Sequence, residues 1–146
     1  GALGIGADLT RWNANDEATA RKWIAAYKTV RTTIQRGDRY RLTRTADGDT
    51  DDATLYVAAD RRQAVLFQML RGSEWRDNPG PIHPRGLDPQ AAYRVRMLDG
   101  GKLPAETPPQ ASGAWWMAHG LRAPLRGDFM GAAFVFDLAN GGTAKP

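Results

Sequence analysis

The feature that most constrains the fold is a change of hydrophobic period at Gly37. Before it, an apolar segment at 3–9 precedes residues whose apolar side chains recur every three or four positions, which predicts one short strand and one long amphipathic helix. After it, apolar and polar residues alternate in short runs between turn residues, which predicts strands. A lone strand and helix ahead of a β-rich remainder indicates that these two elements belong to something larger.

The sequence marks both ends of the helix. Asn13 or Asn15 can cap its first turn, where the carboxylates of Asp16 and Glu17 suit the positive end of the helix dipole. Gly37 can adopt the left-handed conformation that ends a helix. The apolar stripe between these ends consists of Ala20, Trp23, Ile24, Tyr27, Val30 and Ile34. A stripe of this kind must be buried against a partner.

Short strands separated by turns are expected to fill residues 38–146. The near-continuous apolar run at 64–70 predicts the central strand, and Ser112 can cap a brief helical turn that ends at Gly120. About seven or eight strands with such frequent turns predict a mainly β fold, an antiparallel β-sandwich. The expected strands are 40–44, 55–58, 64–70, 82–87, 93–98, 121–125 and 129–138.

Composition limits the classes of protein to which the chain can belong. Its 146 residues are about one domain's length. The absence of cysteine excludes disulfides and thiolate metal ligands and allows a reducing compartment, and we expect a cytoplasmic protein. No run of eighteen apolar residues and no apolar leader is present, so we expect no membrane span and no secretion signal. A net charge of +4 suggests a nucleic-acid partner as an alternative, but interspersed Arg and Asp favour a solvated surface.

Residues with catalytic or metal-binding chemistry form no recognisable site in the sequence. His83 and His119 lie on different expected elements without a further ligand at metal spacing, and most aspartates lie in expected turns. Asp8 would lie at the end of the first strand, without a visible partner carboxylate. We therefore name no catalytic, cofactor-binding or metal-binding residue and expect no cofactor.

Three tryptophans are the remaining candidates for a binding site. Trp75, Trp115 and Trp116 can each offer an indole face for stacking on a sugar ring. They can equally fill the core of the sandwich or an interface between domains. The sequence leaves both interpretations open.

The order of motifs along the chain resembles the C-terminal portion of family-36 glycoside hydrolases, the bacterial α-galactosidases. The matching segments are LGIGADL, WIAAYKTVRTTIQRGDRYRL, YVAADRRQAVLF, RGLDPQAAYRV, SGAWWMAHGL and LRGDFMGAAFVF. The resemblance implies that residues 1–37 are the last strand and helix of a truncated (β/α)8 barrel. Residues 38–146 then correspond to the C-terminal β-sandwich domain of that family.

The resemblance also implies a function for the parent enzyme. Family members hydrolyse terminal α-D-galactosides with retention, using two aspartates on earlier barrel strands. Neither aspartate has a matching position here, so we expect the chain alone to be inactive. The alternatives are a carbohydrate-binding module that uses exposed tryptophan and a basic nucleic-acid-binding domain.

The expected partners follow from the same interpretation. They are the missing barrel domain and, for the parent enzyme, the α-galactoside substrate. Apolar side chains that lack their barrel neighbours would pack on the sandwich or on a second copy of the chain, because large exposed apolar patches favour association. These side chains are Leu3, Ile5, Trp23, Tyr27 and Ile34.

Overall fold

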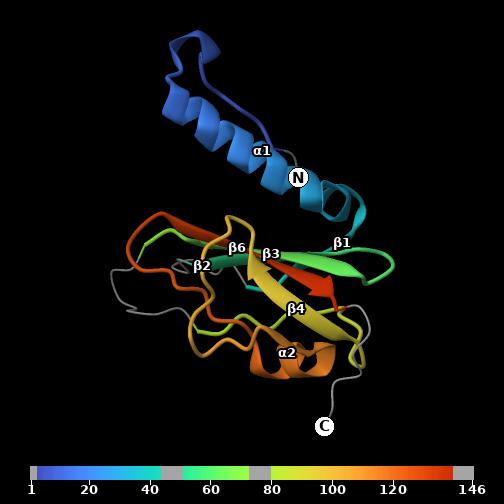
Figure 1. Cartoon of the computed structure of the whole chain (residues 1–146). Coiled ribbons are helices and arrows are strands. Elements are labelled where there is room, and N and C mark those ends of the chain that lie inside the picture. Colours follow the sequence, from blue (N-terminus) through green and yellow to red (C-terminus); the bar gives the residue numbers. More distant parts are fainter. Residues whose placement is uncertain (1–2, 44–50, 73–79, 140–146) are drawn as a thin grey trace.

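The computed structural model describes residues 3–43, 51–72 and 80–139. In this part of the chain six antiparallel strands form one sheet, with a long helix on one face and a short helix on the other (Figure 1). The strand order is β1-β2-β3-β6-β4-β5, so the last strand in sequence lies in the middle of the sheet. The mainly β, antiparallel fold is confirmed, with six strands in place of the expected seven or eight.

The elements follow one another with short connections. A 3-10 turn, η1 (Leu9–Arg11), precedes the long helix α1 (Ala14–Arg36), and the short helix α2 (Gly113–His119) lies between the fifth and sixth strands. None of the described helices combines the length and hydropathy needed to cross a membrane. The strands are β1 (Asp38–Arg41), β2 (Asp51–Val57), β3 (Gln63–Leu70), β4 (Ala92–Met97), β5 (Gln110–Ser112) and β6 (Met130–Leu138).

A capping box starts α1 at the residue that the sequence indicated. The Asn13 side chain accepts hydrogen bonds from the backbone N–H groups of Asn15 and Asp16, at 2.8 and 3.1 Å. In return, the Asp16 carboxylate accepts from the Asn13 N–H at 3.1 Å. Two otherwise unpaired ends of the first turn are thereby satisfied reciprocally.

The helix ends before Gly37, as expected, but the physical reason is different. Gly37 has an extended conformation with φ −76° and ψ 162°, so the left-handed conformation predicted for it is wrong. A Cβ at this position would lie 2.5 Å from the carbonyl oxygens of both Thr33 and Val57. Glycine is therefore needed because the end of α1 and the end of β2 approach closely.

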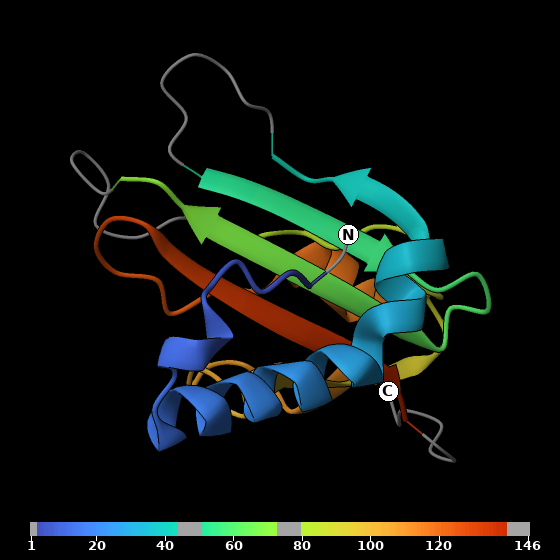
Figure 2. The same ribbon diagram turned by 90° about the horizontal axis from the view of Figure 1, so that it is seen from above.

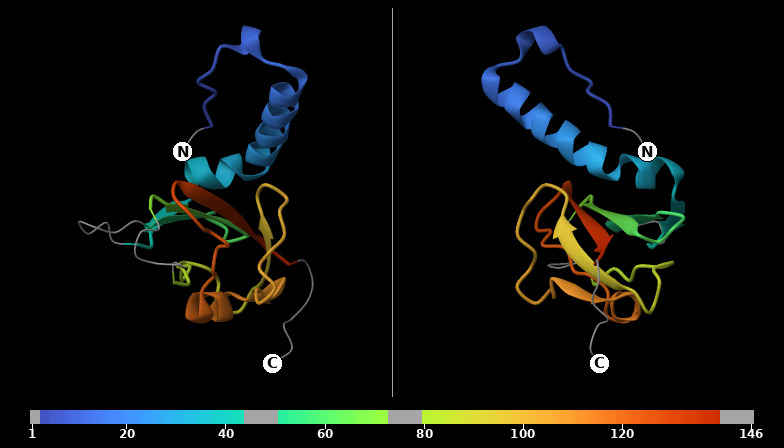
Figure 3. Two further views of the ribbon diagram at one scale, coloured as in Figure 1. Left: turned by 90° about the vertical axis from the view of Figure 1, so that its left-hand side faces the viewer. Right: turned by 45° about the vertical axis from the view of Figure 1, so that its right-hand side comes forward.

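Residues 3–8 do not form the expected strand. They are irregular and exposed, and they return from the start of α1 toward the sheet (Figure 3). Asp8 caps η1 by accepting from the Thr10 N–H at 3.0 Å and the Thr10 hydroxyl at 2.7 Å. A strand needs a neighbour for its backbone N–H and C=O groups, and no described strand pairs with this segment.

The main core lies between the sheet and the layer that contains α2. Segments 82–87 and 121–125, expected as strands, form only one bridge, between Ile82 and Leu121. Pro84 and Pro124 interrupt these segments because proline removes a donor from a ladder. Together with α2 they cover this face completely. Its fully buried side chains include Leu55, Leu66, Tyr93, Trp116, Phe134 and Phe136.

The opposite face of the sheet is covered only in part. Near its C-terminal end α1 packs through Val30 and Ile34 on Val65, Leu98 and Val135. The first half of the helix rises away from the sheet (Figure 3). Seen from above, α1 crosses the sheet obliquely and leaves much of β2 and β3 uncovered (Figure 2).

Candidate functional site

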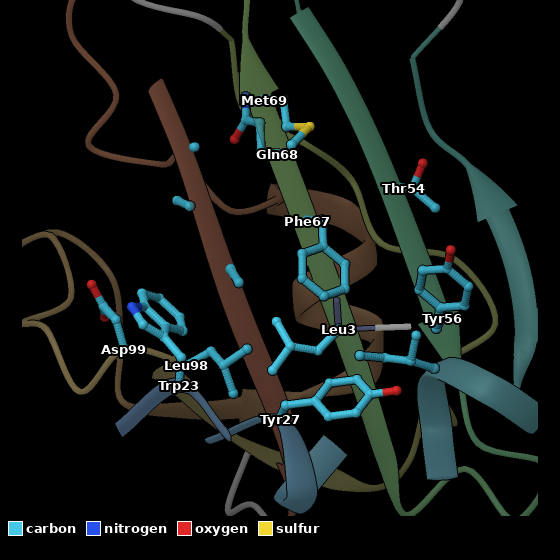
Figure 4. Close-up of a pocket in the computed structure, with 14 residues that line it drawn as sticks. Leu3, Trp23, Tyr27, Thr54, Tyr56, Phe67, Gln68, Met69, Leu98 and Asp99 are labelled. Atoms are coloured by element: carbon cyan, nitrogen blue, oxygen red, sulfur yellow. The ribbon is translucent and has the colours of Figure 1, made fainter. Parts of the chain in front are cut away.

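An apolar groove of about 460 Å³ lies between α1 and the uncovered part of the sheet (Figure 4). Strands β2, β3 and β6 form its floor, and α1, the segment before it and the end of β4 form its walls. We call this feature the groove below. Its floor includes Thr54, Tyr56, Phe67, Met69, Gly131 and Ala133, and its walls include Leu3, Trp23, Tyr27, Leu98 and Asp99.

Strand register explains why these floor residues meet. Thr54 pairs with Phe67, and Phe67 pairs with Ala133. Because side chains alternate between the two faces of a sheet, residues two positions away on each strand lie on the same face. Tyr56 meets the neighbouring Phe67 edge to face, with ring centroids 6.2 Å apart. The floor is low along β6, where Gly131 lacks a side chain.

Large apolar side chains are exposed on this side of the molecule. Among the described residues, seven large hydrophobic side chains are exposed, and none of them belongs to the layer that contains α2. They lie in the N-terminal segment, on α1, or at the end of the sheet where β3 stops and β6 starts. They are Leu3, Ile5, Leu9, Trp23, Met69, Phe129 and Met130, with Phe129 the most exposed at 87%. A surface of this kind fits contact with another folded surface.

The groove carries little catalytic chemistry. Asp99 is the one acidic side chain in its lining, and the carboxylate accepts from the Gly101 N–H at 2.8 Å. Asp8 is exposed, and its hydrogen bonds with Thr10 lower the pKa of its carboxyl. No group of three His, Asp or Glu side chains within the described ranges gathers closely enough to hold a metal ion.

The tryptophan candidates separate into different environments. Trp116 is 0% exposed, donates from Nε1 to the Tyr93 carbonyl at 3.4 Å, and meets Phe136 edge to face. It therefore fills the core, which is one of the two roles considered above. Trp115 is half-buried, with one face stacked on His119 at 4.5 Å between ring centroids. Trp75 lies outside the described residues.

Sequence reasoning found only one side of the groove. The stripe that predicted a buried helix face includes Trp23 and Tyr27, which the structure places in the wall. The floor residues Phe67 and Met69 were missed because the apolar run at 64–70 predicts burial on both faces without indicating what covers each face. The alternation of Thr54 and Tyr56 was the available signal on the neighbouring strand.

The comparison with known families is decisive for classification. Residues 51–136 match the model of the glycosyl hydrolase family 36 C-terminal domain. The chain belongs to glycosyl hydrolase family 36. This family assignment confirms the resemblance noted from the motifs.

Curated relatives agree with this assignment and show how much of each is represented. The probable α-galactosidase C of Aspergillus flavus is 30% identical over 129 residues, which are 88% of this chain and 16% of that protein. The α-galactosidase AgaA of Geobacillus stearothermophilus is 28% identical over 98 residues, which are 67% of this chain and 13% of that protein. The chain thus spans 13–16% of the length of these relatives.

Solved structures share the fold. The crystal structure of the family-36 α-galactosidase AgaB from Geobacillus stearothermophilus matches with a TM-score of 0.74 and 25% identity, covering 90% of this chain and 17% of that one. The crystal structure of the α-galactosidase from Lactobacillus brevis matches with a TM-score of 0.77 and 20% identity, covering 95% of this chain and 19% of that one. At the latter identity the similarity establishes the fold alone.

Proposed function

We propose that this chain is the C-terminal part of an α-galactosidase-like enzyme that hydrolyses terminal α-D-galactosides. In this proposal, α1 and the segment before it end a (β/α)8 catalytic barrel, and the sheet forms the accessory domain behind it. Support comes from the family assignment and from relatives that are named α-galactosidases. The chain contributes structure, and the catalytic groups lie elsewhere in the enzyme.

The groove is the proposed contact for the catalytic domain. The observation that carries this proposal is the unequal cover of the two faces of the sheet, because every exposed large hydrophobic side chain of the described residues lies outside the α2 layer. Burying a large apolar side chain stabilises a protein by roughly 1.5–3 kcal/mol. Trp23 and Met69, which line the groove at 41% and 61% exposed, would supply part of that stabilisation.

The carboxylates of the described residues support a non-catalytic role. Retaining hydrolysis needs two carboxyl groups about 5 Å apart across the scissile bond. Asp137 is held by hydrogen bonds from Gln63 and Arg96, and Asp99 stands alone in the lining of the groove. We therefore infer that the isolated chain does not turn over α-galactosides.

A chromogenic α-galactoside tests the catalytic part of the proposal. The purified chain should release no chromophore under conditions in which intact AgaB from Geobacillus stearothermophilus does. Turnover by the chain alone, retained through successive purification steps, would overturn the proposal.

A chimera tests the docking part. This chain would replace the matching C-terminal region of AgaB, with and without Trp23→Asp. We expect Trp23→Asp to lower activity or thermal stability of the chimera, because it places a charge in the contact. The matched control is Arg85→Asp, an exposed position on the α2 side of the sheet. Equal effects of the two substitutions would contradict docking at the groove.

A further inference from the structure

A chain of polar contacts connects α1 to the sheet beside its apolar contact. The Thr33 hydroxyl donates to Gln63 Oε1 at 2.6 Å, and Gln63 Nε2 donates to Asp137 Oδ1 at 2.8 Å. Arg96 Nε donates to Asp137 Oδ2 at 3.0 Å, and Gln63 Nε2 also approaches the Thr29 carbonyl at 3.4 Å. These contacts join the helix to β3, β6 and β4.

Gln63 is the centre of this chain of contacts. Its amide accepts from one residue of α1 and donates to another, so it reads the position of two successive turns of the helix. Arg96 occupies one oxygen of the Asp137 carboxylate and leaves the other oxygen for Gln63. Thr33 is 4% exposed, so water does not readily replace the partner of its hydroxyl.

Apolar contact alone leaves the direction of α1 weakly determined. The helix has 23 residues, but its buried apolar side chains are Val30 and Ile34, both near its C-terminal end. Apolar burial is non-directional, whereas hydrogen bonds require defined distances and angles. A helix held at one end by two apolar side chains needs a directional contact to set how far its free half stands from the sheet.

We infer that Gln63 is a positioning residue that sets the orientation of α1 over the sheet and thereby the width of the groove. The consequence for the catalytic domain rests on the proposed function, because the groove is its proposed contact. The orientation itself is a property of this chain. It can be measured without substrate or partner.

Electron-spin distance measurements test the inference. The sequence contains no cysteine, so Lys22→Cys on the first half of α1 and Lys102→Cys beyond β4 give one labelled pair. Both positions are exposed. We expect Gln63→Met, which keeps the length of the side chain and removes its hydrogen bonds, to shift or broaden the distance distribution relative to the otherwise unchanged labelled chain.

Val95→Ala is the matched control, because Val95 is buried on the opposite face of the sheet. It should lower stability while the distance distribution stays unchanged. An unchanged distribution in Gln63→Met, or an equal change in Val95→Ala, would overturn the inference. If Gln63→Met does not fold, Thr33→Val decides the question in the same way. The result does not depend on the α-galactoside assay, so the two proposals fail separately.

Discussion

Replacing Gly37 with alanine should destabilise the chain even though the backbone conformation there suits alanine. At φ −76° and ψ 162°, alanine would stabilise the fold by about 0.4–1 kcal/mol if space were available, because it restricts the unfolded chain. The new Cβ would instead lie 2.5 Å from the carbonyl oxygens of Thr33 and Val57. Both are backbone atoms, so the end of α1 must move away from β2.

The magnitude follows from these two opposing effects. Overpacking typically costs about 1–3 kcal/mol, and contact with two backbone oxygens favours the upper part of that range. The movement would also strain the 2.8 Å hydrogen bond from the Gly37 N–H to the Thr33 carbonyl. After subtracting the gain from the restricted unfolded chain, we expect a net loss of about 2 kcal/mol in the free energy of unfolding.

Urea unfolding followed by circular dichroism and tryptophan fluorescence measures this loss by linear extrapolation. For a chain of this size the midpoint of thermal unfolding should fall by roughly 4–8 °C. Gly131→Ala is the control, since the nearest heavy atom to its new Cβ is the Gln68 carbonyl oxygen at 3.7 Å. We expect Gly131→Ala to be neutral or slightly stabilising. The reasoning is refuted if Gly37→Ala is as stable as this control.

Further predictions concern the core, the exposed surface and the response to pH. Trp116→Ala should cost about 3–5 kcal/mol in the free energy of unfolding, more than Trp115→Ala, as urea titration would show; equal costs would contradict the difference in burial. Met69→Asp should reduce self-association in light scattering, and a monodisperse monomer of the unsubstituted chain at high concentration would argue against such association. Burial raises the pKa of Tyr93 above 10.0, so its stabilising contribution is complete below about pH 10 and is lost as the pH rises through the folded-state pKa. Tyr93→Phe should remove this alkaline component, and an unchanged alkaline loss would show that other groups cause it. Galactose should cause no saturable quenching of indole fluorescence, whereas quenching that Trp115→Ala abolishes would favour the carbohydrate-binding alternative.

Local signals predicted the helices and the central strand well. The Asn13 cap and the break at Gly37 bound α1, and Ser112 accepts from the Trp115 N–H at 3.1 Å at the start of α2. The run at 64–70 corresponds to β3, which lies between β2 and β6. These features could be predicted because capping and periodicity depend on residues within a few positions of one another.

The N-terminal segment shows where such signals fail. An apolar composition predicted a strand at 3–9, but a strand is stable only beside another strand that satisfies its backbone. The capping carboxylate of Asp8 instead starts a 3-10 turn. The segments at 82–87 and 121–125 fail for a related reason, since Pro84 and Pro124 limit pairing to the bridge between Ile82 and Leu121.

The sequence by itself determined the elements, the family and the surface of α1 that seeks cover. Only the tertiary structure placed β6 between β3 and β4, brought the floor of the groove under α1, and assembled the contacts of Gln63. Those contacts join residues 30 and 74 positions apart. Partners at that separation are chosen by the packing of the whole sheet, because no local preference distinguishes one distant strand from another.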